Sequence, residues 1–172
     1  MSNSGSEKNS SNSSINMEIN EEIVPVQAAT MNAVYVMNMA LLIPANVLRN
    51  HRENLFKKAM DILDDAYNLA ERAFYNLIGG KFSFIANNLR KELLELQKKI
   101  VKTKNAVRAK VETLDAVKVA VKNLKTQLDK INKERTKIKA GIKLNKVRKS
   151  KKARKSKKVK KSRNGRYHNK RR

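Results

Sequence analysis

Apolar residues recur at spacings of three and four along most of this chain, which is the period of α-helices that bury one face. The first such segment, residues 28–43, is apolar at all but three positions and is bracketed by Pro25 and Pro44. A helix of this length would span roughly 24 Å, short of the ~30 Å hydrocarbon core of a bilayer. We therefore predict a buried helix over 28–43. Contact of this segment with a lipid surface is the alternative, because so apolar a segment is prone to association when exposed.

The segment 47–78 combines an apolar stripe with balanced charge, five basic and five acidic residues. This pattern predicts a second helix with one broad side facing the core. Gly79 and Gly80 follow the segment and permit a tight reversal of the chain. Residues 47–78 and the segment after the glycines are therefore predicted to form a helical hairpin.

The third segment, 84–140, has the sharpest pattern in the chain. Apolar residues occupy thirteen of sixteen a and d positions in an unbroken heptad repeat from Leu89 to Ile142. This predicts one coiled-coil-like helix of roughly 85 Å, of which the preceding helix, at roughly 48 Å, covers only the first half. We therefore expect the remaining seam to meet a second copy of the chain in a dimer or higher assembly. The predicted oligomer seam consists of Leu114, Val117, Val121, Leu124, Leu128, Ile131 and Ile138.

The two ends of the chain are polar and differ in charge. Residues 1–25 are rich in Ser and Asn and carry four acids and one base, which predicts a flexible arm. Residues 143–172 hold 17 Lys or Arg and no acid, and contain the repeats RKSKKA and RKSKKV. They predict a basic tail that is disordered in the free protein. The chain is thus predicted to be all-α, a helical hairpin with a long coiled-coil-like helix in a domain over 26–142, with an arm and a tail.

Charge connects this fold to a class of partner. The chain has 40 Lys or Arg against 15 Asp or Glu, a net charge of +25. Basic side chains bind phosphates and release condensed counterions, so we expect a nucleic-acid partner. Lysine point charges dominate and no groove-reading motif is present, which predicts binding without sequence preference. The predicted nucleic-acid-binding residues are Lys98, Lys102, Arg108, Lys118, Lys122, Lys125, Arg148, Lys149, Lys151, Lys152, Arg154, Lys155, Lys157, Lys158, Lys160, Lys161, Arg163, Arg166, Arg171 and Arg172.

Catalytic chemistry finds no support in the sequence. The chain has no cysteine and two histidines, which excludes disulfides, thiolate zinc sites and cysteine nucleophiles. There is no glycine-rich phosphate loop and no metal-binding helix motif. Asp61, Asp64 and Asp65 lie close together on a predicted helix, but carboxylates on a helix surface without a base partner do not make an active site. We therefore expect no enzyme, no metal site and no cofactor.

The basic helical hairpin and lysine-rich tail of residues 47–172 resemble two groups of proteins. One is the α-helical coat and nucleocapsid proteins of archaeal DNA viruses, which wrap the genome between helices of paired subunits. The other is the bacterial histone H1-like proteins, from which the apolar segment 28–43 departs. The resemblance implies a protein that packages duplex DNA in a virion nucleocapsid or a nucleoid. A secretory signal is not expected, because no basic region is followed by an apolar run and a cleavage site.

Two other functions remain open from the sequence. A ribosomal or other RNA-associated structural protein also uses basic tails, but RNA readers display aromatic stacking surfaces, and the chain has only eight Phe and Tyr. Duplex DNA is therefore favoured over RNA. A membrane-associated coiled-coil scaffold would place residues 28–43 on lipid and the tail on anionic headgroups.

Overall fold

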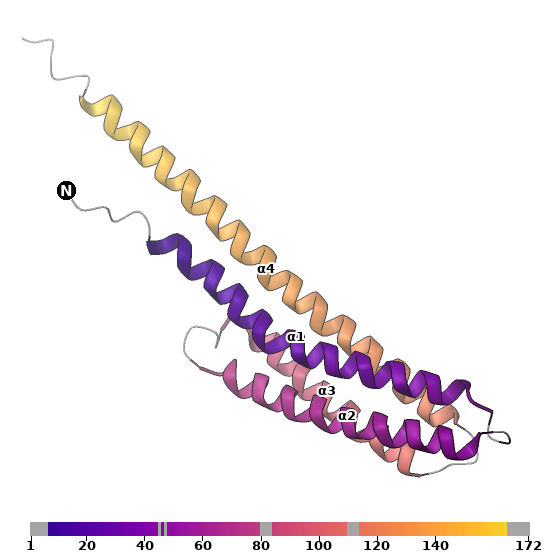
Figure 1. Ribbon diagram of the computed structural model, residues 1–172. Helices are drawn as coiled ribbons and strands as arrows, with labels where there is room; N and C mark the ends of the chain where they lie inside the picture. The colour runs from indigo at the N-terminus through magenta and orange to yellow at the C-terminus, as the bar shows by residue number, and fades with distance from the viewer. Residues whose placement is uncertain (1–6, 45, 47, 80–83, 110–113, 165–172) are drawn as a thin grey trace, which may run out of the picture. The chain divides into compact units, whose positions relative to one another are not determined.

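All regular elements of the described residues are α-helices, so the predicted all-α class is confirmed. The structure is a computed structural model that describes residues 7–44, 46, 48–79, 84–109 and 114–164, with side chains between residues 14 and 142. The chain divides into two compact units, Met1–Thr136 and Lys137–Arg172. The helices are α1 (Glu7–Leu42), α2 (Arg49–Asn76), α3 (Asn87–Arg108) and α4 (Asp115–Asn164) (Figure 1).

Within the first unit, α1, α2, α3 and the beginning of α4 form an antiparallel four-helix bundle (Figure 1). Side-chain hydrogen bonds join each helix to its neighbours. They run from Asn76 Nδ2 to Glu22 Oε1 (2.9 Å), from Lys104 Nζ to Asp64 Oδ1, from Gln127 Nε2 to Glu92 Oε2 (2.6 Å) and from Arg135 Nη1 to Gln27 Oε1 (3.0 Å). These bonds close a ring of four helices, the arrangement that short connections between successive helices favour.

The core of the bundle is built from one heptad face of each helix. On all four helices, the spacing between buried residues alternates between three and four, as in coiled coils. The face of α2 is rich in alanine, which lets α1 approach α2 closely. The largest fully buried side chains are Ile19, Ile23, Met37, Leu63, Leu77, Leu89, Leu93, Leu96, Ile100, Leu124, Ile131 and Gln127.

α1 extends further toward the N-terminus than predicted. Residues up to 25 are predicted to be a flexible arm, yet α1 begins at Glu7 and passes through Pro25. Proline inside a helix costs about 3 kcal/mol. Ile19 and Ile23 are fully buried, and each such side chain contributes ~1.5–3 kcal/mol, which offsets the proline. Residues 1–6 of the predicted arm lie outside the described residues.

The predicted single helix over 84–140 is instead two helices, because α3 ends at Arg108 and α4 begins at Asp115. Gln127 Nε2 donates a hydrogen bond to the backbone oxygen of Glu92 at 2.8 Å. In one continuous helix these two residues, 35 positions apart, would be separated by roughly 52 Å. The chain therefore folds back between the two helices, and the heptad face is buried on both sides of the break.

The predicted oligomer seam is covered by the chain itself. Its five central residues, from Val117 to Ile131, have exposed fractions of 0–5%. Leu114 and Ile138 at its ends are half-buried. α4 folds back onto the bundle, where Gln127 bonds to Glu92 of α3 and Arg135 bonds to Gln27 of α1. The inward face of α4 is therefore buried within the chain. The five central residues therefore do not form an exposed surface for self-association.

α4 also continues into the segment 143–172, which is predicted to be a disordered tail. The helix runs to Asn164, and neither proline nor glycine occurs between residue 143 and that point. Lys and Arg, which dominate this stretch, are good helix formers. Residues 165–172 lie outside the described residues.

Candidate nucleic-acid interface

Two of the predicted binding residues, Lys98 and Lys118, form exposed ion pairs within their own helices. Lys98 Nζ lies 2.6 Å from Glu95 Oε1, and Lys118 Nζ lies 3.2 Å from Asp115 Oδ1. The hydrogen bond from Lys98 holds the pKa of the Glu95 carboxyl below its ordinary value. The two lysine side chains are 68% and 60% exposed. Because water screens such exposed pairs and they contribute little to stability, a phosphate can compete with either carboxylate.

Lys102, Lys122 and Lys125 form no salt bridge with another described residue. Each is exposed, as is Arg108 in the last turn of α3. Their charges are therefore balanced by solvent and counterions, which a polyanion would displace.

The predicted lysines of the bundle occupy two separate flanks. Lys118, Lys122 and Lys125 lie at positions i, i+4 and i+7 of α4 and so share one face of that helix. The α4 residues that face α3 are a different set and include Val119 and Asn123. The structure therefore does not gather the predicted bundle residues into one patch. It places Lys98 and Lys102 on α3 and the three α4 lysines on the far flank of α4.

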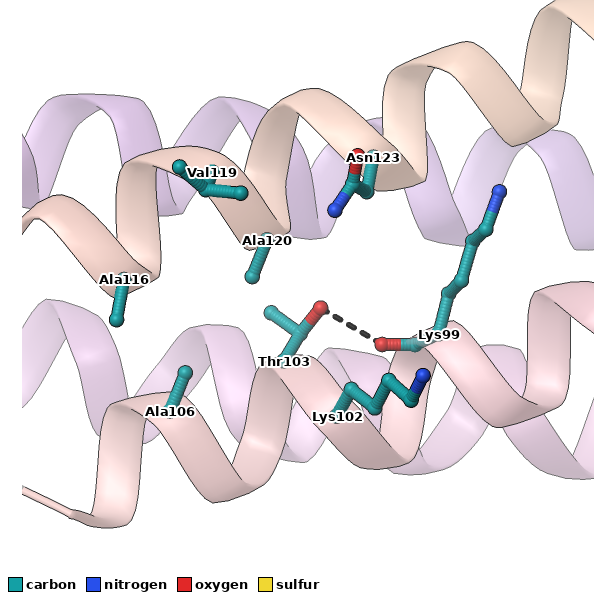
Figure 2. Close-up of a pocket in the computed structure, with 8 residues that line it drawn as sticks. All are labelled: Lys99, Lys102, Thr103, Ala106, Ala116, Val119, Ala120 and Asn123. Atoms are coloured by element: carbon teal, nitrogen blue, oxygen red, sulfur yellow. Dashed lines mark hydrogen bonds between the residues drawn. The ribbon is translucent and has the colours of Figure 1, made fainter.

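A groove of about 340 Å³ separates α3 from α4 (Figure 2). Small side chains such as Ala106 and Ala116 open it at one end, and Lys99 and Lys102 lie at the other (Figure 2). One of the predicted binding residues, Lys102, thus lines this groove. The lining residues are Lys99, Lys102, Thr103, Ala106, Ala116, Val119, Ala120 and Asn123.

A polar network beside the groove fixes how α3 and α4 meet. Lys99 Nζ donates to Gln127 Oε1 at 2.7 Å, and Gln127 Nε2 donates to Glu92 Oε2 at 2.6 Å. Gln127 is fully buried, and burial together with the nearby Lys130 lowers the pKa of the Lys99 ammonium. Glu92, Lys99 and Gln127 are not among the residues predicted from the sequence. The heptad pattern could have identified them, because all three occupy g positions, which flank the seam.

The predicted binding residues of the tail lie in the second unit. Those from Arg148 to Arg163 are on the described backbone of α4, whereas Arg166, Arg171 and Arg172 lie outside the described residues. The helical backbone of residues 143–164 gives this basic stretch a regular rise of about 1.5 Å per residue.

Other kinds of site are not apparent in the part of the chain that the structure describes. No three His, Cys, Asp or Glu side chains there gather to hold a metal ion. Of the three clustered aspartates of α2, Asp64 pairs with Lys104 of α3. Over its described residues, no helix has the length and apolar character that crossing a membrane requires.

Comparison of the chain with models of protein families, with curated proteins and with solved structures yields no match. The resemblance to viral nucleocapsid proteins and the expectation that the chain is no enzyme therefore stay predictions.

Proposed function

We propose that this chain is a non-sequence-specific DNA-binding and packaging protein, a nucleocapsid subunit that neutralises and organises duplex DNA. The observation that carries the proposal is the segregation of charge. Of the 40 Lys and Arg, 17 fall within residues 143–172, where there is no acid. Duplex DNA carries one negative charge per ~1.7 Å of axis, so such a segment replaces many counterions at once.

The bundle adds to this binding in a way that suits packaging. Exposed lysines occupy both flanks described above, with Lys102 on α3 and Lys122 and Lys125 on the far flank of α4. Charges that face different directions favour contacts with more than one segment of nucleic acid, and these contacts bring the segments together. Lysine dominates on both flanks, and its ammonium contacts phosphates without reading bases.

The proposal is tested by removing the basic segment. We would compare the full chain with a chain that ends at Ile142, measuring affinity for a short random duplex over a series of salt concentrations. If ~10 basic residues of the segment contact phosphates, the log–log salt slope of the full chain should exceed that of the shortened chain by roughly 9 units. Equal slopes and equal affinities would refute the proposal.

Two controls separate charge from sequence. A full-length chain whose residues 143–172 are shuffled keeps the charge and should keep the affinity. Random and AT-rich duplexes should bind within about tenfold of each other, or ~1.4 kcal/mol. A strong preference for structured RNA over duplex DNA would instead favour an RNA-associated structural protein.

A further inference from the structure

α1 carries a second apolar heptad strip on the side that faces away from the bundle. Its buried residues lie at one set of positions, and exposed residues repeat at spacings of three and four on the opposite side. Between 43% and 83% of each apolar side chain in this strip is accessible to solvent. We call it the outer strip. Its large apolar members are Met17, Val24, Met31, Tyr35, Met39 and Leu42.

Five of the six apolar residues of the outer strip lie in the longest stretch of the sequence without charge. No charged residue occurs between Ile23 and Leu48, in a chain whose net charge is +25. Two copies of so basic a protein repel each other along α3, α4 and the C-terminal segment. Along the outer strip they can approach without placing like charges together.

The spacing of the outer strip indicates a helical partner. A repeat of 3.5 residues keeps an apolar face turned toward a second helix, and this is the signature of coiled-coil pairing. The six apolar residues, at roughly 100 Å² exposed each, amount to roughly 600 Å² per chain, close to the ~800 Å² per partner of a standard protein interface.

The strip is also complementary to itself when two copies run antiparallel. Four of its six apolar positions are symmetric about the level of Ala33, so a two-fold axis at that level places Val24 opposite Leu42 of the other copy and Met31 opposite Tyr35. The exposed Glu21 at the acidic end of one strip then lies near the start of α2 in the other copy, where Arg49 is exposed. A parallel pair would instead place the acidic ends of both copies side by side.

We propose that the outer strip of α1 is a dimer interface, at which two copies of this chain pair as antiparallel helices about an axis near Ala33. This surface differs from the seam on α4, which the chain itself covers. The pairing does not require nucleic acid, so it stands or falls independently of the proposed DNA packaging.

A lipid surface is the other occupant that an apolar strip invites. Helices that lie on membranes flank the apolar face with Lys and Arg, which attract anionic headgroups. The outer strip is flanked by Glu18, Glu21 and Glu22 at one end and by neutral residues for the rest of its length. This arrangement favours a second copy of the chain.

The first test measures mass by sedimentation of the full chain, free of nucleic acid, in about 1 M NaCl, where the Debye length is ~3 Å and repulsion is screened. We expect a dimer, and we expect Met31→Glu with Tyr35→Glu to raise its dissociation constant at least 100-fold. The matched control is Val101→Glu with Val119→Glu. Val101 is 46% exposed, like Met31, and Val119 is 59% exposed against 63% for Tyr35, so the control adds the same charge at equal exposure. It should leave the dimer intact, and circular dichroism should show all three proteins equally helical.

The second test fixes the direction of pairing with engineered cysteines, since the chain has none of its own. A mixture of Val24→Cys and Leu42→Cys proteins should form disulfide-linked dimers on mild oxidation, whereas either protein alone should form few. Linkage of Val24→Cys to itself would indicate parallel pairing and overturn the proposed register.

Two outcomes would overturn the dimer itself. One is a monomer under conditions in which the chain is fully helical. The other is a dimer that the substitutions at Met31 and Tyr35 leave as stable as the control does. Vesicles of anionic lipid provide a third arm: binding that these substitutions abolish, in a chain that sediments as a monomer, would assign the outer strip to lipid instead.

Discussion

α1 and α4 both bury an apolar face, but their exposed faces differ in chemical character. Each turns an apolar heptad face into the bundle, with residues such as Met37 on α1 and Leu124 on α4 fully buried. The outward side of α1 carries Met31 and Tyr35 in an uncharged stretch, whereas the outward side of α4 carries lysines such as Lys122. The inward faces therefore account for the fold, and the outward faces differ in the partner that we propose for each helix: another helix for α1 and phosphates for α4.

The largest expected effect is the difference in stability between truncating a side chain on the inward face of α4 and truncating one on the outward face of α1. Leu124→Ala should lower the free energy of unfolding by about 2–5 kcal/mol, because it leaves a cavity in the core. Leu124 is 0% exposed, whereas Leu42 is 83% exposed and should tolerate Leu42→Ala, in the monomer, within about 0.5 kcal/mol. Urea unfolding of both proteins, with Met31→Glu and Tyr35→Glu in the background to keep them monomeric, measures the difference. Equal destabilisation would mean that α4 does not pack on the bundle.

The next effect concerns the polar network that joins α4 to α3. Gln127→Ala leaves Lys99 and the carboxylate of Glu92 without the buried amide that bonds to both. Removing one partner from a buried hydrogen-bonded group costs about 1–3 kcal/mol. The control is Gln27→Ala on α1, which removes only a bond from Arg135 and should cost less. If both substitutions cost the same in urea unfolding, the network does not set the register of α3 and α4.

The heptad repeat predicted which faces are buried, and it could not predict where the chain reverses. From Leu89 to Ile131 the heptad register of the sequence is not interrupted at the break between α3 and α4. Periodicity alone therefore predicts one continuous helix. The second helix is shorter than the predicted rod, which correctly indicates that another helix must cover the rest of the seam. It does not indicate which helix does so. A second copy and a fold-back both cover the seam, and only packing distinguishes them.

At the N-terminus, the prediction relied on the local tendency of proline to end a helix. Pro25 predicts a helix boundary, but tertiary burial of Ile19 and Ile23 overrides its intrinsic cost. For the candidate site, the sequence identified the basic residues of the bundle and the structure divides them between two flanks. That division depends on which side of α4 faces α3. The residue pattern of a single helix does not determine which neighbour lies on which side.

A smaller effect tests the outward lysines of α4 directly. Lys122→Gln with Lys125→Gln should lower the salt slope of DNA binding by about 2 units, since each phosphate contact contributes ~0.9. Stability should hardly change, because neither lysine forms a salt bridge with a described residue. Lys57→Gln with Lys58→Gln on α2 is the matched control, with two exposed lysines on a helix of balanced charge. An equal loss in both proteins would show that net charge alone, and not the position of the lysines, governs binding.

The smallest expected effect lies in the exposed pair of Glu95 and Lys98 on α3. Because the hydrogen bond and charge of Lys98 lower the pKa of Glu95 in the folded chain, the pair stabilises the fold above the ordinary pKa of 4.5. That contribution is lost as the pH falls through the lower folded value. Lys98→Gln should therefore raise the pKa of Glu95 toward 4.5, measured by NMR titration of the side-chain carboxyl. Duplex DNA that draws Lys98 away should shift the pKa in the same direction, while the negative potential of the phosphates adds to the rise. A Glu95 pKa that is the same with and without duplex would show that this part of α3 does not meet the phosphates.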